Sequence, residues 1–290
     1  SLPWAGCQFI REMEGALRQG QAEALQSTAS AVAAVLSQRP LLIYTDPQRR
    51  LAPQDGQRSV YARPTDQPVI VDGYGDGWED VEQQQFINRA GSTSVGVKAQ
   101  TRGQFLYLLL KVQDREIIYH NPGISEEPNG DRLVLRMWRD NKRQDYVIAT
   151  SAPGQVRAKP ANRRMRGLDA GRIGGYWQDA VGGYTLELQV PLSYTGERLG
   201  FFVVNESALL GRKSEFVGNI SRLDSGAPPW LVYSPAALQS LPGSFARHGG
   251  QIQILDQHNW QVGRVRAGAA AAPDERETFW LLKLLYRTIL

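Results

Sequence analysis

The chain has 290 residues, of which 42% are hydrophobic and 21% charged, and its net charge is +4. These fractions are typical of soluble globular proteins, so they exclude a wholly disordered chain and predict one large domain or two ordinary ones. A single cysteine, Cys7, excludes internal disulfides and thiolate metal sites. No apolar run reaches the roughly 18 residues that a membrane-spanning helix needs.

The basic residues form no long block, and the densest segments are 136–143 and 163–166. We interpret both as solvated loops, with contacts to phosphates or anionic lipid headgroups as the alternative. We expect no nucleic-acid partner. The chain opens at Ser1 with neither an initiator Met nor a signal-peptide pattern, as expected for a fragment trimmed at a domain edge.

Residues 1–40 predict a long N-terminal helix, which Pro40 ends. The apolar residues recur at helical spacing: Ile10, Met13, Leu17, Ala24, Leu25, Thr28, Val32, Val35 and Leu36. Core packing and membrane-proximal signalling both remain open as the role of this helix. Residues 41–68 contain Pro47, Pro53 and Pro64 and are expected to form a connector.

Residues 69–222 change to alternating periodicity, which predicts β-strands. Leu106–Val112 is apolar on both faces, as in a central strand, and Tyr184–Val190 alternates apolar with polar residues. No helix-length segment lies between the strands, which argues against a parallel α/β sheet. We therefore predict a mainly β protein with flanking α structure, built on an antiparallel β-sandwich.

Residues 223–290 change character again, and Gly226–Pro229 is interpreted as a linker. Gln251–Leu255 and Gln261–Val265 predict a hairpin, and residues 276–290 predict an amphipathic helix. That helix would lie at an interface or dock on the chain's own core. We expect a small α+β segment here, with a second sensor lobe as one interpretation.

No enzyme signature is present. The three histidines, His120, His248 and His258, belong to no catalytic triad or metalloprotease motif. A pair of carboxylates from distant strands remains an alternative. Residues 72–80 cluster Asp and Gly, which would suit calcium, but Asp-Gly turns between strands explain them more simply. We expect a non-catalytic fragment with no cofactor and no metal.

The central segment carries a set of residues in a characteristic order. They are Asp72-Gly73, Asp76, Trp78, Phe105-Leu106-Tyr107, Val112, Asp114, Gly130-Asp131, Val134, Gly183-Tyr184, Glu187, Pro191 and Gly200 to Asn205. Over residues 69–205, about half the chain, this pattern resembles the family 9 carbohydrate-binding modules. The resemblance implies a β-sandwich and carbohydrate binding.

The flanks are similar to another family. Leu2-Pro3-Trp4, the stretch 11–17 and the segment 252–265 resemble the sensor region of proteobacterial histidine kinases associated with a dedicated sortase system. This resemblance implies the periplasmic part of an inner-membrane protein, flanked by membrane and homodimeric in the full-length receptor. Nothing in the chain resembles the kinase core.

Aromatic side chains stack on sugar rings in carbohydrate-binding modules, because the C–H face of a pyranose is apolar and packs well against the face of an aromatic ring. Trp138 lies on the polar-facing side of its predicted strand beside Arg136, and Tyr176 and Trp177 adjoin a Gly-rich loop. We predict a ligand site formed by Arg136, Trp138, Tyr176 and Trp177. Packing of the two tryptophans beneath loops is the alternative.

We therefore predict an extracytoplasmic sensing region of a membrane-bound histidine kinase. It would bind an unknown small molecule, a carbohydrate or an envelope protein, and relay binding through the N-terminal helix. The alternative is a non-catalytic carbohydrate-binding module of a secreted or surface protein, which would not need that helix. A third interpretation is a scaffold that recognises an envelope protein.

Overall fold

The computed structural model describes residues 2–38, 59–162, 168–207, 213–233, 251–255 and 261–266. The chain divides into two compact units, one of residues 48–234 and 255–263, the other of residues 1–47, 235–254 and 264–290. The amphipathic helix expected at 276–290, the basic segment 163–166 and most of the expected connector lie outside the described residues. The domain boundaries inferred from the sequence stay predictions.

In the unit that contains the N-terminus, α1 spans Leu2–Gln38. The structure describes side chains of this helix only within residues 18–38. Whether the apolar stripe runs along the whole helix therefore stays a prediction. Val32 and Leu36, one helical turn apart, are buried, whereas Leu25 is exposed. Within the described ranges, no helix is long and apolar enough to cross a membrane. The two strands expected for a hairpin, β14 (Gln251–Leu255) and β15 (Gln261–Arg266), pair in a separate two-stranded sheet.

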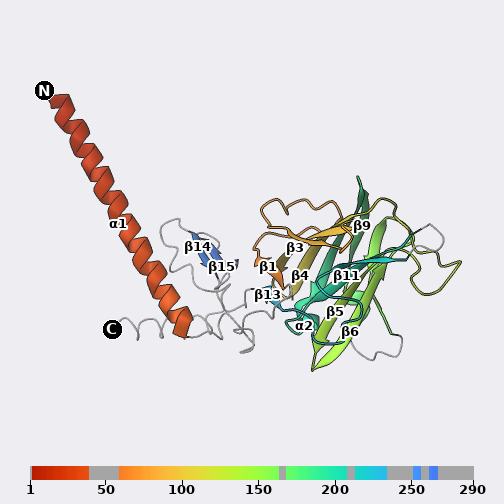
Figure 1. Ribbon diagram of the computed structural model, residues 1–290. Helices are drawn as coiled ribbons and strands as arrows, with labels where there is room; N and C mark the ends of the chain where they lie inside the picture. The colour runs from red at the N-terminus through yellow and green to blue at the C-terminus, as the bar shows by residue number, and fades with distance from the viewer. Residues whose placement is uncertain are drawn as a thin grey trace. The chain divides into compact units, whose positions relative to one another are not determined.

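The other unit contains two sheets, which lie as two layers in Figure 1. The large sheet has the order β13-β1-β3-β4-β10-β9-β7, with β2 paired to β3, and the small sheet has the order β12-β11-β5-β6-β8. The bounds are β1 Val60–Pro64, β2 Gln84–Ile87, β3 Ser94–Arg102, β4 Phe105–Gln113, β5 Arg132–Arg139, β6 Lys142–Ala149, β7 Gly154–Arg157, β8 Lys159–Pro160, β9 Gly174–Ala180, β10 Gly183–Pro191, β11 Gly200–Asn205, β12 Glu215–Gly218 and β13 Leu231–Tyr233. Two short helices, η3 (Ala170–Arg172) and α2 (Leu192–Thr195), lie between strands.

The predicted sandwich is confirmed, and its strands within residues 69–222 pair with one another antiparallel. The large sheet extends beyond those residues through β1 and β13, which the prediction did not include. β1 runs parallel to both of its neighbours, β3 and β13. Parallel neighbours need a long connection, whereas antiparallel neighbours are joined by short hairpins. The chain between β1 and β2 is segment 65–83, which contains three glycines and one proline. It reaches Glu187 on β10 instead of turning back.

The core lies between the two sheets. β4 contributes Leu106, Leu108 and Leu110, and β5 contributes Leu133, Leu135 and Met137, all of them buried. The alternation read from the sequence therefore gives the inward face of β5 correctly. Burial of each such side chain contributes about 1.5–3 kcal/mol, which makes this layer the main source of stability.

The outer face of the large sheet is also covered. Tyr107 and Leu109, which alternate with the core leucines of β4, pack with Trp78 and Val81 from the segment 65–83. This second cluster explains why β4 is apolar on both faces, as expected for a central strand.

Glu187 on β10 holds this covering segment in place. Its side chain is fully buried. One carboxylate oxygen accepts hydrogen bonds from the backbone N–H groups of Gly73 at 2.9 Å and Asp72 at 3.2 Å, and the other accepts one from the Trp78 indole at 2.6 Å. Burial raises the pKa of Glu187, while these three donors lower it. Segment 72–80 is thus an anchored covering loop, in which Gly73 has a positive φ of 89°.

We predict that Glu187→Ala lowers the free energy of unfolding by about 3 kcal/mol, because it leaves two buried donors and one part-buried donor without an acceptor. Chemical denaturation of the 290-residue chain measures this loss. Glu82→Ala, which removes an exposed carboxylate from the same covering segment, should change stability by less than about 0.5 kcal/mol. Equal midpoints for Glu187→Ala and the parent chain would contradict the anchoring role.

Candidate functional site

The structure does not bring the four predicted ligand residues together. Trp138 and Arg136 lie on β5 of the small sheet, whereas Tyr176 and Trp177 lie on β9 of the large sheet. Trp138 is half-buried and its indole donates to Asn141 Oδ1 at 3.2 Å. Tyr176 is half-buried on the outer face of the large sheet, where it is paired with Glu187 in register. The predicted two-sided aromatic site is therefore not formed.

Trp177 is a core residue, which corrects its assignment as a ligand residue. It is 1% exposed, and its ring stacks on Tyr184 with centroids 3.9 Å apart. The neighbouring glycines suggested a loop, but Gly174 and Gly175 belong to strand β9. A Cβ at Gly175 would lie 1.8 Å from the Glu187 carbonyl oxygen. The glycine thus permits close approach of two strands, and the alternation of β9 then places Trp177 inward.

We predict that Trp177→Ala lowers the free energy of unfolding by about 3–5 kcal/mol, because it opens a cavity in the main core. Trp138→Ala should cost less than about 1 kcal/mol, because the side chain is partly solvated. Denaturant unfolding of the two single variants measures both values. A Trp177→Ala protein as stable as the parent would contradict the core assignment.

Arg136 is also buried, at 1% exposure, so it is not available to a ligand. Its guanidinium pairs with both oxygens of Asp145, at 2.9 and 3.0 Å, and donates to the carbonyl oxygen of Asp224. Arg143 also pairs with Asp145, at 2.5 Å. Sequence alternation placed Arg136 on the outer face of its strand, but it did not show that the segment around Asp224 covers it. Arg136 positions that segment.

The segment held by Arg136 forms one wall of a groove of about 1340 Å³. The groove is lined by residues 87–90, which connect β2 to β3, and by residues 215–229. Two half-buried residues of this lining, Phe216 and Ile220, pack against the cluster of Val134, Phe202 and Val204 on the outer face of the small sheet. The predicted linker Gly226–Pro229 is part of this lining.

Charged side chains also line the groove. The guanidinium of exposed Arg222 lies 5.4 Å from the centroid of the Phe216 ring. Arg89 is exposed on the opposite segment. Asp224 accepts a hydrogen bond from the Ser221 backbone N–H at 2.7 Å, so its carboxylate is used within its own turn. Arg89 and Arg222 are thus the two exposed basic residues of the lining, which also contains the acidic residues Glu215 and Asp224.

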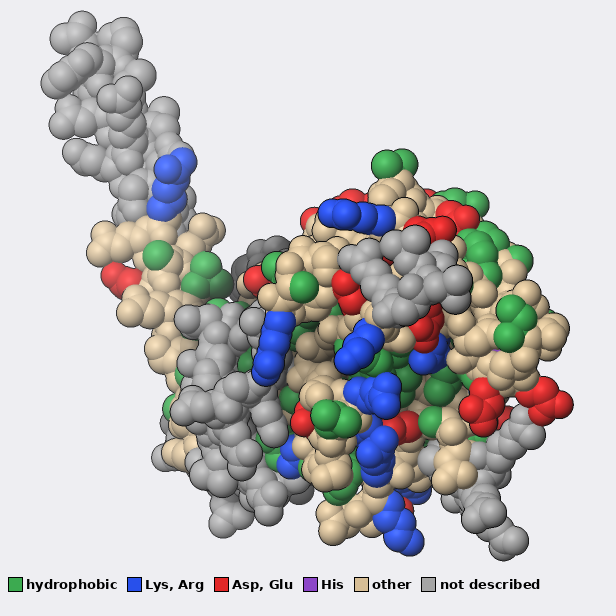
Figure 2. Space-filling model, turned by 45° about the vertical axis from the view of Figure 1, so that its right-hand side comes forward, with side chains coloured by type: hydrophobic (Ala, Val, Ile, Leu, Met, Phe, Trp, Pro, Cys, Tyr) green, Lys and Arg blue, Asp and Glu red, His purple; other side chains and the backbone are tan. Residues whose placement is uncertain are grey.

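The surface charge is not evenly spread. Figure 2 shows a row of Lys and Arg side chains on one face of the molecule, with Asp and Glu side chains around it.

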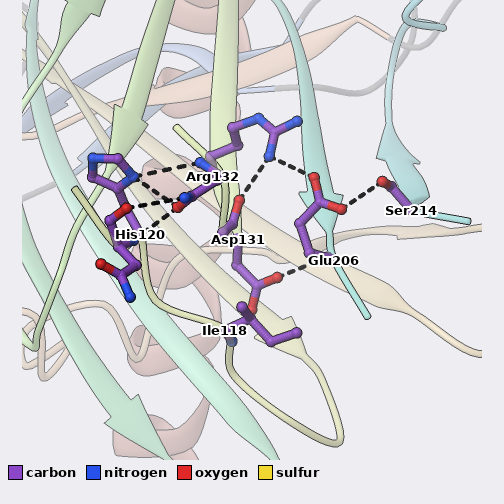
Figure 3. Close-up of polar contacts among 9 residues, drawn as sticks. Ile118, His120, Asp131, Arg132, Glu206 and Ser214 are labelled. Carbon is purple, nitrogen blue, oxygen red and sulfur yellow. Dashed lines mark hydrogen bonds and ion pairs between the residues drawn. The ribbon is translucent and has the colours of Figure 1, made fainter. Parts of the chain in front are cut away.

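A second polar site lies where the strands end (Figure 3). Asp131 accepts hydrogen bonds from the backbone N–H groups of Ile118 and Glu206, both at 2.8 Å. Glu206 pairs with Arg132 at 2.7 Å and accepts a hydrogen bond from Ser214 at 2.6 Å. Burial raises the pKa of Asp131 to about 7. A small cavity of about 100 Å³ adjoins this network.

No group of three or more His, Cys, Asp or Glu side chains is arranged to hold a metal ion in the part of the chain that the structure describes. His120 lies in the loop before β5, where its Nδ1 is 2.9 Å from Asn129 Oδ1. His248 and His258 lie outside the described residues.

The chain is similar to two solved structures of a family 9 carbohydrate-binding module from Caldicellulosiruptor kristjanssonii. The complex with cellotriose is 17% identical, with a TM-score of 0.45 over 60% of this chain and 91% of the module. The complex with glucose is 17% identical, with a TM-score of 0.40 over 55% of this chain and 85% of the module. Neither a protein-family model nor a curated protein matches the sequence. The two packed sheets by themselves define a mainly β protein of the sandwich class.

Proposed function

We propose that the sandwich is a non-catalytic binding module and that its ligand is a carbohydrate bound in the groove of residues 87–90 and 215–229. The observation that carries the proposal is the combination of groove size and lining. At about 1340 Å³ the groove exceeds the roughly 300–1,000 Å³ of a typical small-molecule pocket, which suits an extended oligomer.

The chemistry of the lining supports the same ligand class. The aromatic ring of Phe216 and the apolar side chain of Ile220 match the C–H faces of sugar rings. Arg89 and Arg222 supply several N–H donors each, and these suit hydroxyl and ring oxygens. Trp138, Tyr176 and Trp177 are not needed in this site.

A second candidate function is the sensing region of a periplasmic receptor of the histidine-kinase type. The presence of another compact unit with a long helix, α1, favours it, because a free binding module has no use for such a helix. In this proposal the receptor is a homodimer flanked by membrane, and the module supplies ligand recognition. The two proposals differ in the protein to which the sandwich belongs, a membrane receptor or a free module. Both place the ligand in the same groove.

A glycan-array screen of the 290-residue chain, followed by calorimetry on each binding glycan, tests the proposal. We predict that Arg222→Ala and Phe216→Ala each raise the dissociation constant at least about tenfold, which corresponds to about 1.4 kcal/mol. Arg139→Ala is the matched control, because Arg139 is an exposed arginine on β5 that pairs with Asp140 and does not line the groove. It should leave the dissociation constant within about twofold.

Absence of glycan binding by the folded chain would contradict the carbohydrate proposal and favour the recognition of an envelope protein. Saturable binding that both groove variants leave unchanged would contradict the location of the site.

A further inference from the structure

A side chain on one wall of the groove reaches across to the other wall. Glu215, the first residue of β12, belongs to the wall formed by residues 215–229. Its Oε2 accepts hydrogen bonds from Asn88 Nδ2 at 3.0 Å, from Ser92 Oγ at 2.6 Å and from Thr93 Oγ1 at 2.6 Å. These three donors belong to the turn 88–93 between β2 and β3, which carries the other wall. Glu215 therefore links the two walls directly.

The turn that receives these bonds is also fixed within itself. Asn88 Oδ1 accepts a hydrogen bond from the Ser92 backbone N–H at 3.0 Å, and the Asn88 carbonyl oxygen accepts one from the Gly91 N–H at 3.0 Å. The Asn88 N–H donates to the Thr93 carbonyl oxygen at 3.1 Å. Arg89, which follows Asn88 and lines the groove, is thus carried on a closed turn whose position depends on Asn88.

Two further contacts hold the base of this turn to the small sheet. Asn205 Nδ2 on β11 donates to Thr93 Oγ1 at 3.1 Å. The Phe86 ring on β2 packs edge-to-face on Phe201 of β11, with the ring centroids 5.1 Å apart. Both contacts lie next to the strands, whereas the bonds of Glu215 also reach the part of the turn that lines the groove.

We propose that Glu215 is a positioning residue for the groove. It fixes the distance between the two walls, so that Arg89 on one wall and Arg222 on the other bind the same glycan chain. The inference rests on the proposed carbohydrate function of the groove and assigns a residue that acts through the turn 88–93. A site whose walls are already in place binds more tightly than one that the ligand must order, because ordering costs conformational entropy.

A carboxylate suits this task better than a neutral acceptor. Hydrogen bonds to an ionised acceptor are roughly twice as strong as bonds between neutral groups. Glu215 is half-buried, and Thr93, one of its donors, is 1% exposed, so water has limited access to compete for these bonds. Truncation of Glu215 removes the acceptor that Asn88, Ser92 and Thr93 share, and the turn is then held only at its base.

Hydrogen–deuterium exchange of the 290-residue chain without ligand tests the link between the walls. The amides of Ser92 and Thr93 both donate to Asn88 Oδ1. Glu215→Ala should make them open at least about tenfold more often, because Asn88 loses its bond to the small sheet. Glu215→Gln, which keeps an acceptor oxygen, should restore most of the protection. Glu82→Ala, which removes an exposed carboxylate just before β2, should retain the parent profile.

A double-mutant cycle tests the positioning role. The probe is the tightest binder among the soluble hexasaccharides of cellulose, xylan and chitin, and calorimetry measures its dissociation constant. Arg89→Ala should weaken binding several-fold in the parent chain but change it little in the Glu215→Ala chain, because the wall that carries Arg89 is then no longer held at the ligand. Arg222→Ala should have the same effect in both chains, because Arg136 holds its segment independently. A residue that serves only the stability of the fold would leave both pairs additive.

Unchanged exchange of Ser92 and Thr93 in Glu215→Ala, with β4 and β10 still protected, would overturn the link between the walls and with it the proposal. Additive effects of Glu215→Ala and Arg89→Ala would overturn the positioning role even if both variants bind more weakly. Neither result contradicts glycan binding in the groove, which the glycan array tests separately. Absence of binding by every glycan would overturn the proposed function and the positioning role together, whereas the link between the walls is decided by exchange alone.

Discussion

Each sheet carries a buried charged side chain on its outer face, and this side chain determines where a loop covers the sheet. Glu187 on β10 is buried by the segment that carries Asp72, Gly73 and Trp78, and Arg136 on β5 is buried by the segment that carries Asp224. A buried charge costs several kcal/mol unless hydrogen bonds satisfy it, so each residue requires its covering loop. The first loop closes its face, whereas the second leaves a groove beside it.

The sandwich is predictable from the sequence because apolar and polar residues alternate along its strands. β5 and β10 show this alternation of residue types, although their outward side chains are mostly buried as well. The hydrophobic run of β4 correctly indicates a central strand covered on both sides. The parallel placement of β1 is not predictable, because it depends on pairing with β13 at the far end of the unit. Strand periodicity carries no information about which distant strand becomes the neighbour.

The candidate site is predictable only in small part. Sequence alternation separates the two faces of a strand, but it does not show which outward residues a loop will cover, and Arg136 was misassigned for this reason. Trp177 was misassigned because the adjoining glycines suggested a loop, whereas they allow two strands to approach. The sequence carried one signal of the groove that was missed, the apolar residues Phe216 and Ile220 near the polar residues Asn219, Ser221 and Arg222.

The central claim is that the groove beside the Arg136-held segment is where the ligand binds. Hydrogen–deuterium exchange of the full chain, with and without a glycan that binds in calorimetry, tests it most directly. The account predicts slower exchange in residues 215–229 and 87–90 when the glycan is bound, with little change in the segment held by Glu187. Slower exchange confined to residues 72–80 or to β9 would place the ligand on the other sheet and contradict the account.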